Sequence, residues 1–140
     1  MIYAYTNTTQ TLTSGTSVKF NTIGEKAGKT TCLNTGSGTI NLRVPGLYLV
    51  NFNADVAAST TAGSIVLQLY KNGVLYPGAE STTYSSSIVD IRNASFTAVI
   101  KVGNCCNCCS NASNSTSFNI VVSGVTADLT NAAITVTKIA

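Results

Sequence analysis

Four of the five cysteines of this 140-residue chain stand within five consecutive positions, as Cys105, Cys106, Cys108 and Cys109. Thiolates are the preferred ligands of Zn²⁺ and Cu(I), and both the C-x-C and the C-x-x-C spacings of soft-metal sites are present. A structural zinc site usually joins two separated pairs of ligands, whereas this chain has one short run. We therefore treat the four thiols as a candidate Zn site that several copies of the chain would complete together.

The same thiols support two other interpretations. One is disulfide bonding, within the loop or between chains, in an oxidising medium. Adjacent cysteines rarely bond to each other because a disulfide needs a specific separation and dihedral angle, so pairing between chains is easier. The other is a loop of small residues whose thiols stay reduced. Cys32, in a predicted strand, is interpreted as a small buried hydrophobic residue that is also able to pair with the cluster.

The residue types argue against an enzyme and against a nucleic-acid-binding protein. There is no histidine, so no Ser-His-Asp or Cys-His arrangement can form within the chain. The net charge is only +3 and the basic residues are scattered singly, so no basic patch for nucleic acid is visible. The acidic residues are far apart in the sequence and form no obvious acid-base pair: they are Glu25, Asp55, Glu80, Asp90 and Asp128.

The apolar residues are distributed in short runs. No stretch approaches the ~20 apolar residues that a helix needs to cross a bilayer, so we expect no membrane contact. The first residues, Met1–Thr6, lack the basic and apolar segments of a secretory signal. We therefore expect the chain to be made in a cytosol, without a signal peptide.

The stretch 38–54 is the most informative one for the fold. Apolar and polar residues alternate up to Val44, Pro45-Gly46 is a turn signal, and a second run follows over 47–53. This pattern predicts a hairpin. The second run is apolar on both sides, which predicts a strand inside a sheet with both of its faces covered.

Short strands separated by turn residues are expected along the rest of the chain. Asn72-Gly73 is the strongest hairpin signal among them, and residues 24–28 are interpreted as a loop. We expect a single all-β domain over 1–140, a β-sandwich without a helix. The further strands are expected at 3–5, 17–20, 30–33, 64–70, 87–93, 95–102, 117–123 and 133–139.

Several short motifs, in the same order and at similar spacing, resemble those of the C1q and tumour-necrosis-factor-like (C1q/TNF-like) jelly rolls. Pro45-Gly46-Leu47-Tyr48 is similar to the PG-x-Y strand, Val18-Lys19-Phe20 to the V-x-F strand, and residues 67–73 to the L-x-L-x-x-N-G hairpin. At the position of the family's L-x-x-G-D motif, Asn104 replaces the Asp. The sequence shows no acidic loop of the kind that binds calcium in C1q-like domains, so the resemblance implies no calcium site.

The resemblance implies a jelly-roll β-sandwich of two antiparallel sheets that assembles as a homotrimer about a three-fold axis. A short chain without a signal peptide resembles the phage branch, which implies a capsid decoration or head-fibre protein on the virion surface. Its partner would be the major capsid protein or another virion protein. The alternatives are a receptor-binding or adhesin tip for cell-surface glycan, and a bacterial spore-surface protein. The strand residues expected in the core or the trimer contact are Tyr48, Val50, Phe52, Leu67, Leu69, Phe96, Phe118 and Ile134.

Overall fold

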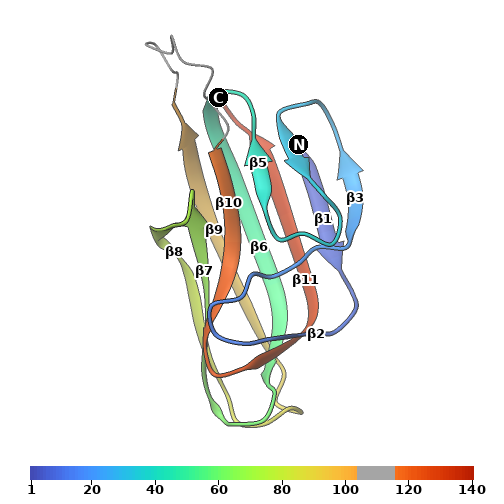
Figure 1. Ribbon diagram of the computed structural model, residues 1–140, viewed down its shortest axis with the longest axis vertical. Helices are drawn as coiled ribbons and strands as arrows, with labels where there is room; N and C mark the ends of the chain where they lie inside the picture. Colours follow the sequence, from blue (N-terminus) through green and yellow to red (C-terminus); the bar gives the residue numbers. More distant parts are fainter. Residues whose placement is uncertain (104–115) are drawn as a thin grey trace.

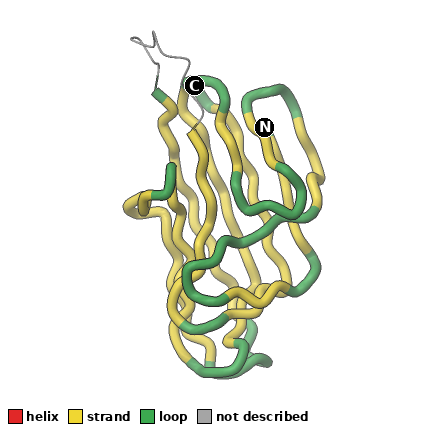
Figure 2. Tube along the Cα trace, in the orientation of Figure 1, coloured by secondary structure: helices red, strands yellow, loops and turns green. Residues whose placement is uncertain are grey.

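A computed structural model describes residues 1–103 and 116–140 of the chain. Those residues form strands and connecting turns, without a helix (Figures 1 and 2). The strands are β1 (Ile2–Thr6), β2 (Gln10–Leu12), β3 (Thr22–Lys26), β4 (Thr31–Leu33), β5 (Ile40–Leu42), β6 (Gly46–Ala58), β7 (Gly63–Lys71), β8 (Val74–Ser85), β9 (Arg92–Val102), β10 (Thr116–Gly124) and β11 (Ala127–Lys138).

The strands form two sheets that pack face to face (Figure 1). Sheet A has the order β3-β1-β11-β6-β9, and β2 also pairs with β11. Sheet B has the order β4-β5-β10-β7-β8. Every pairing is antiparallel, which confirms the predicted sandwich of two antiparallel sheets.

The predicted hairpin at Pro45-Gly46 is wrong, although both of its strands exist. β5 pairs with β4 and β10 in sheet B, whereas β6 pairs with β11 and β9 in sheet A. The turn therefore carries the chain from one sheet to the other. Gly46 has φ +142, and a Cβ there would collide with the carbonyl oxygen of Ala140, so the position favours glycine.

The structures predicted for residues 17–20 and 24–28 are also wrong. Residues 17–20 form only isolated bridges, Ser17 with Val121 and Phe20 with Ser37, because this segment crosses from sheet A to sheet B. The amides of Gly15 and Val18 donate to the carbonyls of Val122 and Ile120 on β10. The loop expected at 24–28 overlaps β3, which extends sheet A beyond β1.

The core lies between the sheets and is rich in aromatic rings. The Phe52 ring on β6 packs edge-to-face against Phe20, with 6.4 Å between the ring centroids. It also packs against Phe96 on β9, with 5.3 Å between the centroids. Such pairs contribute about 0.5–1.5 kcal/mol beyond the apolar area that they bury. Tyr48 is fully buried and its hydroxyl donates to the carbonyl of Val44 at 2.7 Å. Burial raises the pKa of the Tyr48 phenol.

The outer face of β6 is open, which corrects the expectation that both faces of this strand are covered. Tyr48, Val50 and Phe52 are buried against sheet B. On the opposite face Leu47 and Leu49 are half-buried and Asn51 and Asn53 are exposed. The outer pattern changes from leucine to asparagine along the strand, so only part of this face is apolar.

Candidate assembly surface

The strands β8 and β9 form one side of the sandwich, where the edges of the two sheets lie next to each other (Figure 1). The hydrogen bonds of the neighbouring strand β6 show which N–H and C=O groups of β9 point away from the sheet. Leu47 of β6 exchanges hydrogen bonds with the C-terminal residues, its amide donating to Ala140 and its carbonyl accepting from Ile139. Alternate residues of β6 therefore face β11, and their partners on β9 turn their N–H and C=O groups outward. The β9 residues whose main-chain N–H and C=O groups point outward are Asn93, Ser95, Thr97, Val99 and Lys101.

Side chains from sheet B satisfy the outward carbonyls at one end of β9. The Tyr76 hydroxyl donates to the carbonyl of Val99 at 2.6 Å. The Lys71 ammonium donates to the carbonyl of Lys101 at 2.7 Å and lies 5.9 Å from the centre of the Tyr76 ring. The β7–β8 hairpin thus covers the part of β9 that lies near the chain termini.

The other half of β9 has no such cover within the described residues. No hydrogen bond joins the outward main-chain groups of Asn93, Ser95 and Thr97 to other described residues, and we call this stretch the open edge. The side chains here bond across the outer face of sheet A instead. Thr97 donates to the Asn51 amide oxygen at 2.7 Å, and the Asn93 amide donates to the Asp55 carboxylate at 3.3 Å.

A shallow hollow of ≈ 470 Å³ lies on this face next to the open edge. Its polar lining consists of amides and hydroxyls, from Asn51, Asn53, Asn93, Ser95 and Thr97. None of these groups is charged at neutral pH, and none is paired with a base that would make it a nucleophile. The hollow has the chemistry of a hydrogen-bonding surface rather than that of a catalytic site.

The β8–β9 connection, residues 86–91, is fastened at its base, and we call it the tip loop. The buried Ser85 hydroxyl accepts from the Ala58 amide at 2.9 Å and lies 2.8 Å from the carbonyl of Asp90. The Asp90 carboxylate accepts from the Ser86 amide at 2.8 Å and from Arg92 Nε at 2.8 Å. The Ser86 amide and then the Arg92 guanidinium lower the pKa of Asp90 to about 2.

The tip loop presents apolar side chains to solvent. Val89 is 83% exposed, and Ile88 and Ile91 are more than half exposed. The sequence predicted a strand over 87–93, which is wrong for 87–91. Ile88, Val89 and Ile91 are β-branched residues of the kind that favour a strand. Ser85 and Asp90 bond to the local main chain and bend it into a loop instead.

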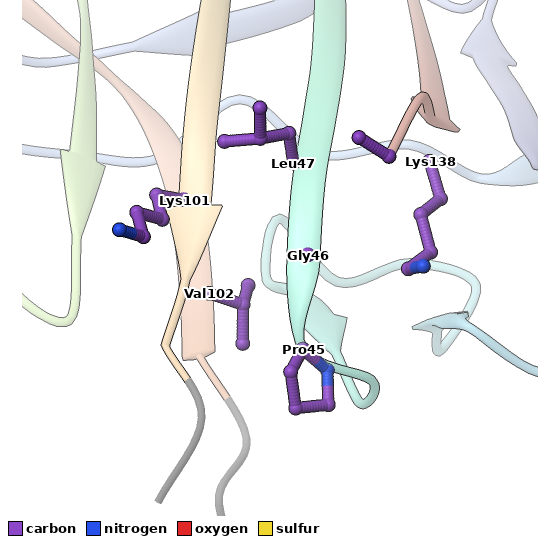
Figure 3. A pocket seen from close by; sticks show the side chains of 7 residues that line it. Pro45, Gly46, Leu47, Lys101, Val102 and Lys138 are labelled. Carbon is purple, nitrogen blue, oxygen red and sulfur yellow. The ribbon is translucent and has the colours of Figure 1, made fainter.

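A second pocket, of ≈ 270 Å³, lies at the opposite end of the sandwich, beside the C-terminus (Figure 3). Pro45, Leu47 and Val102 form its apolar lining. Lys101 and Lys138 flank it from opposite sides of β6, so their ammonium groups point apart (Figure 3). No carboxylate side chain, hydroxyl or thiol lines this pocket, so its described walls offer no acid-base pair.

The four clustered cysteines, Cys105, Cys106, Cys108 and Cys109, lie outside the described residues. The Zn site, the disulfide and the reduced loop therefore all stay predictions. Cys32 lies on β4 and is half-buried. Within 1–103 and 116–140 no group of three His, Cys, Asp or Glu side chains is placed to hold a metal ion.

The eight strand residues expected in the core or the trimer contact all lie on strands of the sandwich. Phe96 is half-buried against the core, and the rest are buried between the sheets. Their role in a contact between copies stays a prediction. The open edge was missed because it depends on the strand order, and the tip loop was missed because hydrogen bonds of Ser85 and Asp90 bend a segment with the residue types of a strand. In the part of the chain that the structure describes, no helix is long and apolar enough to cross a membrane.

Comparison with known proteins identifies the architecture. No protein-family model and no curated protein sequence matches the chain. Among solved structures, the globular domain of zebrafish complement 1qA superposes with a TM-score of 0.70 at 17% identity, over 99% of this chain and 96% of that one. The fold is that of the C1q/TNF-like jelly rolls.

Two further structures show how widely this jelly roll is used. Eiger TNF from S. frugiperda matches with a TM-score of 0.69 at 12% identity, over 99% of this chain and 92% of that chain. The PRD1 vertex protein P5 matches with a TM-score of 0.52 at 16% identity, over 99% of this chain and 96% of that chain. The C1q/TNF-like jelly roll therefore accounts for the whole described chain, and these identities establish the fold alone.

Proposed function

We propose that this chain is a non-enzymatic structural protein that assembles as a homotrimer on the exterior of a virion, as a capsid decoration or head-fibre protein. The observation that carries the proposal is the match of 99% of the chain to C1q/TNF-like jelly rolls, together with motifs that resemble this family in sequence. The likeness to the PRD1 vertex protein P5 supports a place on a virion.

Assembly is the mechanism of such a protein. Each copy has a core closed between its two sheets, and the apolar groups left outside are available for contacts between copies. A trimer presents three identical surfaces to a capsid or fibre, so the whole complex binds more tightly than any single contact would allow. The partner in this proposal is the major capsid protein or another virion protein.

The native mass of the purified protein, measured with and without reductant and chelator, tests the assembly. We expect a mass of three chains, which apolar contacts hold together in both conditions. Loss of the trimer in reductant, or loss of bound metal mass in chelator, would show that Cys105, Cys106, Cys108 and Cys109 bridge chains or bind Zn. A monomer in every condition would contradict the homotrimer.

The place on the virion needs a separate test. Antibodies raised against the protein should label intact particles in electron micrographs, at positions that a deletion of its coding region removes. Labelling only of cells or of soluble fractions would contradict the virion location and favour the spore-surface alternative.

The hollow next to the open edge favours a second candidate function, a tip that binds cell-surface glycan. Its amide and hydroxyl groups, including Asn51, Asn53 and Thr97, are of the kind that hydrogen-bond to sugars. An array of glycans tested with the wild type and with Asn53→Ala separates the candidates. Binding that the substitution abolishes would support the glycan function, and no binding would leave the structural role.

A further inference from the structure

We infer that the end of the sandwich that holds the chain termini docks onto a carboxylate-rich surface of another virion protein. The inference rests on the proposed place on a virion, and it adds which end faces the particle and the chemistry of the partner. Three observations support it: the charge along the strands, the lack of internal partners for the cations, and the apolar groups among them. We call this end the basic end, and its cationic residues are Lys26, Lys29, Arg43, Lys71, Lys101 and Lys138.

In sheet A, three of these lysines lie where strands begin or end beside the termini (Figure 1). Lys101 on β9 and Lys138 on β11 both pair with the first residues of β6. Lys26 ends β3 and pairs with Ile2, the first residue of β1. Lys101 and Lys138 lie on opposite sides of β6, so the positive charge is spread across this end (Figure 3).

Sheet B and its connecting loops contribute the other three cations. Arg43 follows β5, and its amide donates to the carbonyl of Thr30 at 2.9 Å, in the loop that carries Lys29. Lys71 ends β7, and its ammonium donates to the carbonyl of Lys101 at 2.7 Å, so it reaches the same end. The fold therefore brings together basic residues that are scattered singly in the sequence.

The acidic residues are distributed differently. Of the five, Glu25 on β3 is the one at the basic end, so its six cations leave a formal charge of +5 there. The rest of the chain has two basic and four acidic residues, a charge of −2, and the two regions together make up the net +3. Residues 104–115 contain no Lys, Arg, Asp or Glu, so this balance covers the whole chain. Such an asymmetry attracts an acidic partner to one end.

The cations of the basic end have no acidic partner within the described residues. The one ion pair described joins Arg92 to Asp90, in and beside the tip loop at the opposite end. Other acids near that end are bonded within the chain, since Asp128 accepts from a threonine hydroxyl at 2.6 Å and Asp55 from an asparagine amide at 3.3 Å. Folding thus satisfies these carboxylates and leaves the cations available to another molecule.

Apolar groups among the cations favour a protein as the partner. Met1 and Val44 are more than a third exposed at this end, and Ile139 is 51% exposed. A protein surface offers carboxylates and apolar side chains together, whereas a nucleic-acid backbone offers phosphates. Phosphate recognition also favours the arginine fork, and Arg43 is the one arginine among the six cations.

Rebinding to particles tests the inference. Purified protein is added to particles made without its coding region, and the bound fraction is measured by sedimentation over a range of salt concentrations. Lys29→Gln combined with Arg43→Gln removes two charges from the basic end. Lys19→Glu is the matched control, because it changes the net charge equally but lies beside Gln10 of β2, which pairs with the first part of β11. All three side chains are exposed, so the variants should keep the circular dichroism spectrum of the wild type.

We expect the dissociation constant to rise at least about tenfold for the double variant and to stay unchanged for Lys19→Glu, because each copy loses two contacts and the copies bind together. Added salt should weaken the wild type more than the double variant. A double variant that binds like the control would overturn the inference while leaving the virion location in place. A wild type that does not bind the particles would overturn that location and this inference with it.

Carbodiimide cross-linking of the bound protein identifies the chemistry of the partner. The reagent activates a carboxylate, which a neighbouring lysine amine attacks to form an amide while the reagent leaves as a urea. We expect cross-links from Lys29, Lys101 or Lys138 to Asp or Glu of another virion protein, and none from Lys19. Binding without a cross-link at the basic end would overturn the carboxylate partner and indicate phosphate groups instead.

Discussion

Strand β9 has two halves that share one core but differ at the edge of the sheet. On the inner face both halves are packed, with Ala98 and Ile100 buried in one half and Ala94 buried in the other. At the edge, Tyr76 and Lys71 donate to the outward carbonyls of Val99 and Lys101 in the half near the termini, whereas the outward carbonyls of the open edge accept from no described residue. The folding of one chain therefore does not require the open edge to be covered.

The shared core is where a substitution should have the largest effect. Phe52→Ala removes the ring that joins Phe20 and Phe96, and we expect it to lower the free energy of unfolding by ~3–5 kcal/mol. Denaturant unfolding measures this loss. Tyr84→Ala, which truncates an exposed ring, should change stability by less than about 0.5 kcal/mol. Equal losses in the two variants would mean that the core is not where we place it.

The second largest loss of stability should come from a substitution at the base of the tip loop. Ser85→Ala removes the buried hydroxyl that accepts from the Ala58 amide, and we expect a loss of ~1–3 kcal/mol because that amide is left without a partner. The matched control is Ser64→Ala, because Ser64 is exposed on β7 and no hydrogen bond of its hydroxyl is described. An unchanged unfolding midpoint for Ser85→Ala would show that the loop is not held by this residue.

Removing the Tyr76 hydroxyl should make the edge of β9 near the termini less protected, and so more like the open edge. Tyr76→Phe deletes the hydroxyl that donates to Val99 and keeps the ring, so we expect a loss of ~0.5–1.5 kcal/mol in stability. The Val99 region should then exchange its amide hydrogens faster. Tyr84→Phe is the control because no hydrogen bond of its hydroxyl is described. An unaltered exchange rate near Val99 would show that this hydroxyl does not protect the edge.

Protonation of Asp90 at low pH should have the smallest effect on stability, through the loss of its hydrogen bonds in the tip loop. The folded pKa of Asp90, about 2, lies below its ordinary value of 3.8, so its ionised form is favoured in the folded chain. The stability that these bonds contribute is present above pH 3.8 and is lost as the pH falls through about 2. NMR shifts of Ser86 and Arg92 should report this change, and Asp90→Asn should abolish it. Shifts that titrate near pH 4 would contradict the bonds.

The sequence predicted the parts of the fold that depend on local chemistry. Asn72 and Gly73 adopt φ of +51 and +79, which the Asn-Gly signal anticipates, and the pair forms the β7–β8 hairpin as expected. The alternation over Tyr48, Val50 and Phe52 identified buried positions correctly. These features depend on neighbouring residues, so they can be inferred without knowledge of the topology.

What the sequence missed depends on partners that are distant along the chain. The turn at Pro45-Gly46 looks like a hairpin, yet β5 and β6 pair with strands in different sheets. The tip loop has the residue types of a strand, but the Ser85 hydroxyl at its base accepts from the distant Ala58 amide and also bonds to the carbonyl of Asp90, which bends the chain. The open edge is invisible in the sequence, since strand order alone makes β9 an edge.

Amide hydrogen exchange along β9 tests the central claim most directly. In wild-type protein diluted until its native mass is that of one chain, we expect fast exchange at the outward amides of Asn93, Ser95 and Thr97. The inward-facing amides of Ala98 and Ile100 bond to β6, so they should exchange slowly and serve as internal references. Slow exchange at all three outward amides in the single chain would contradict the claim that the fold leaves this edge open.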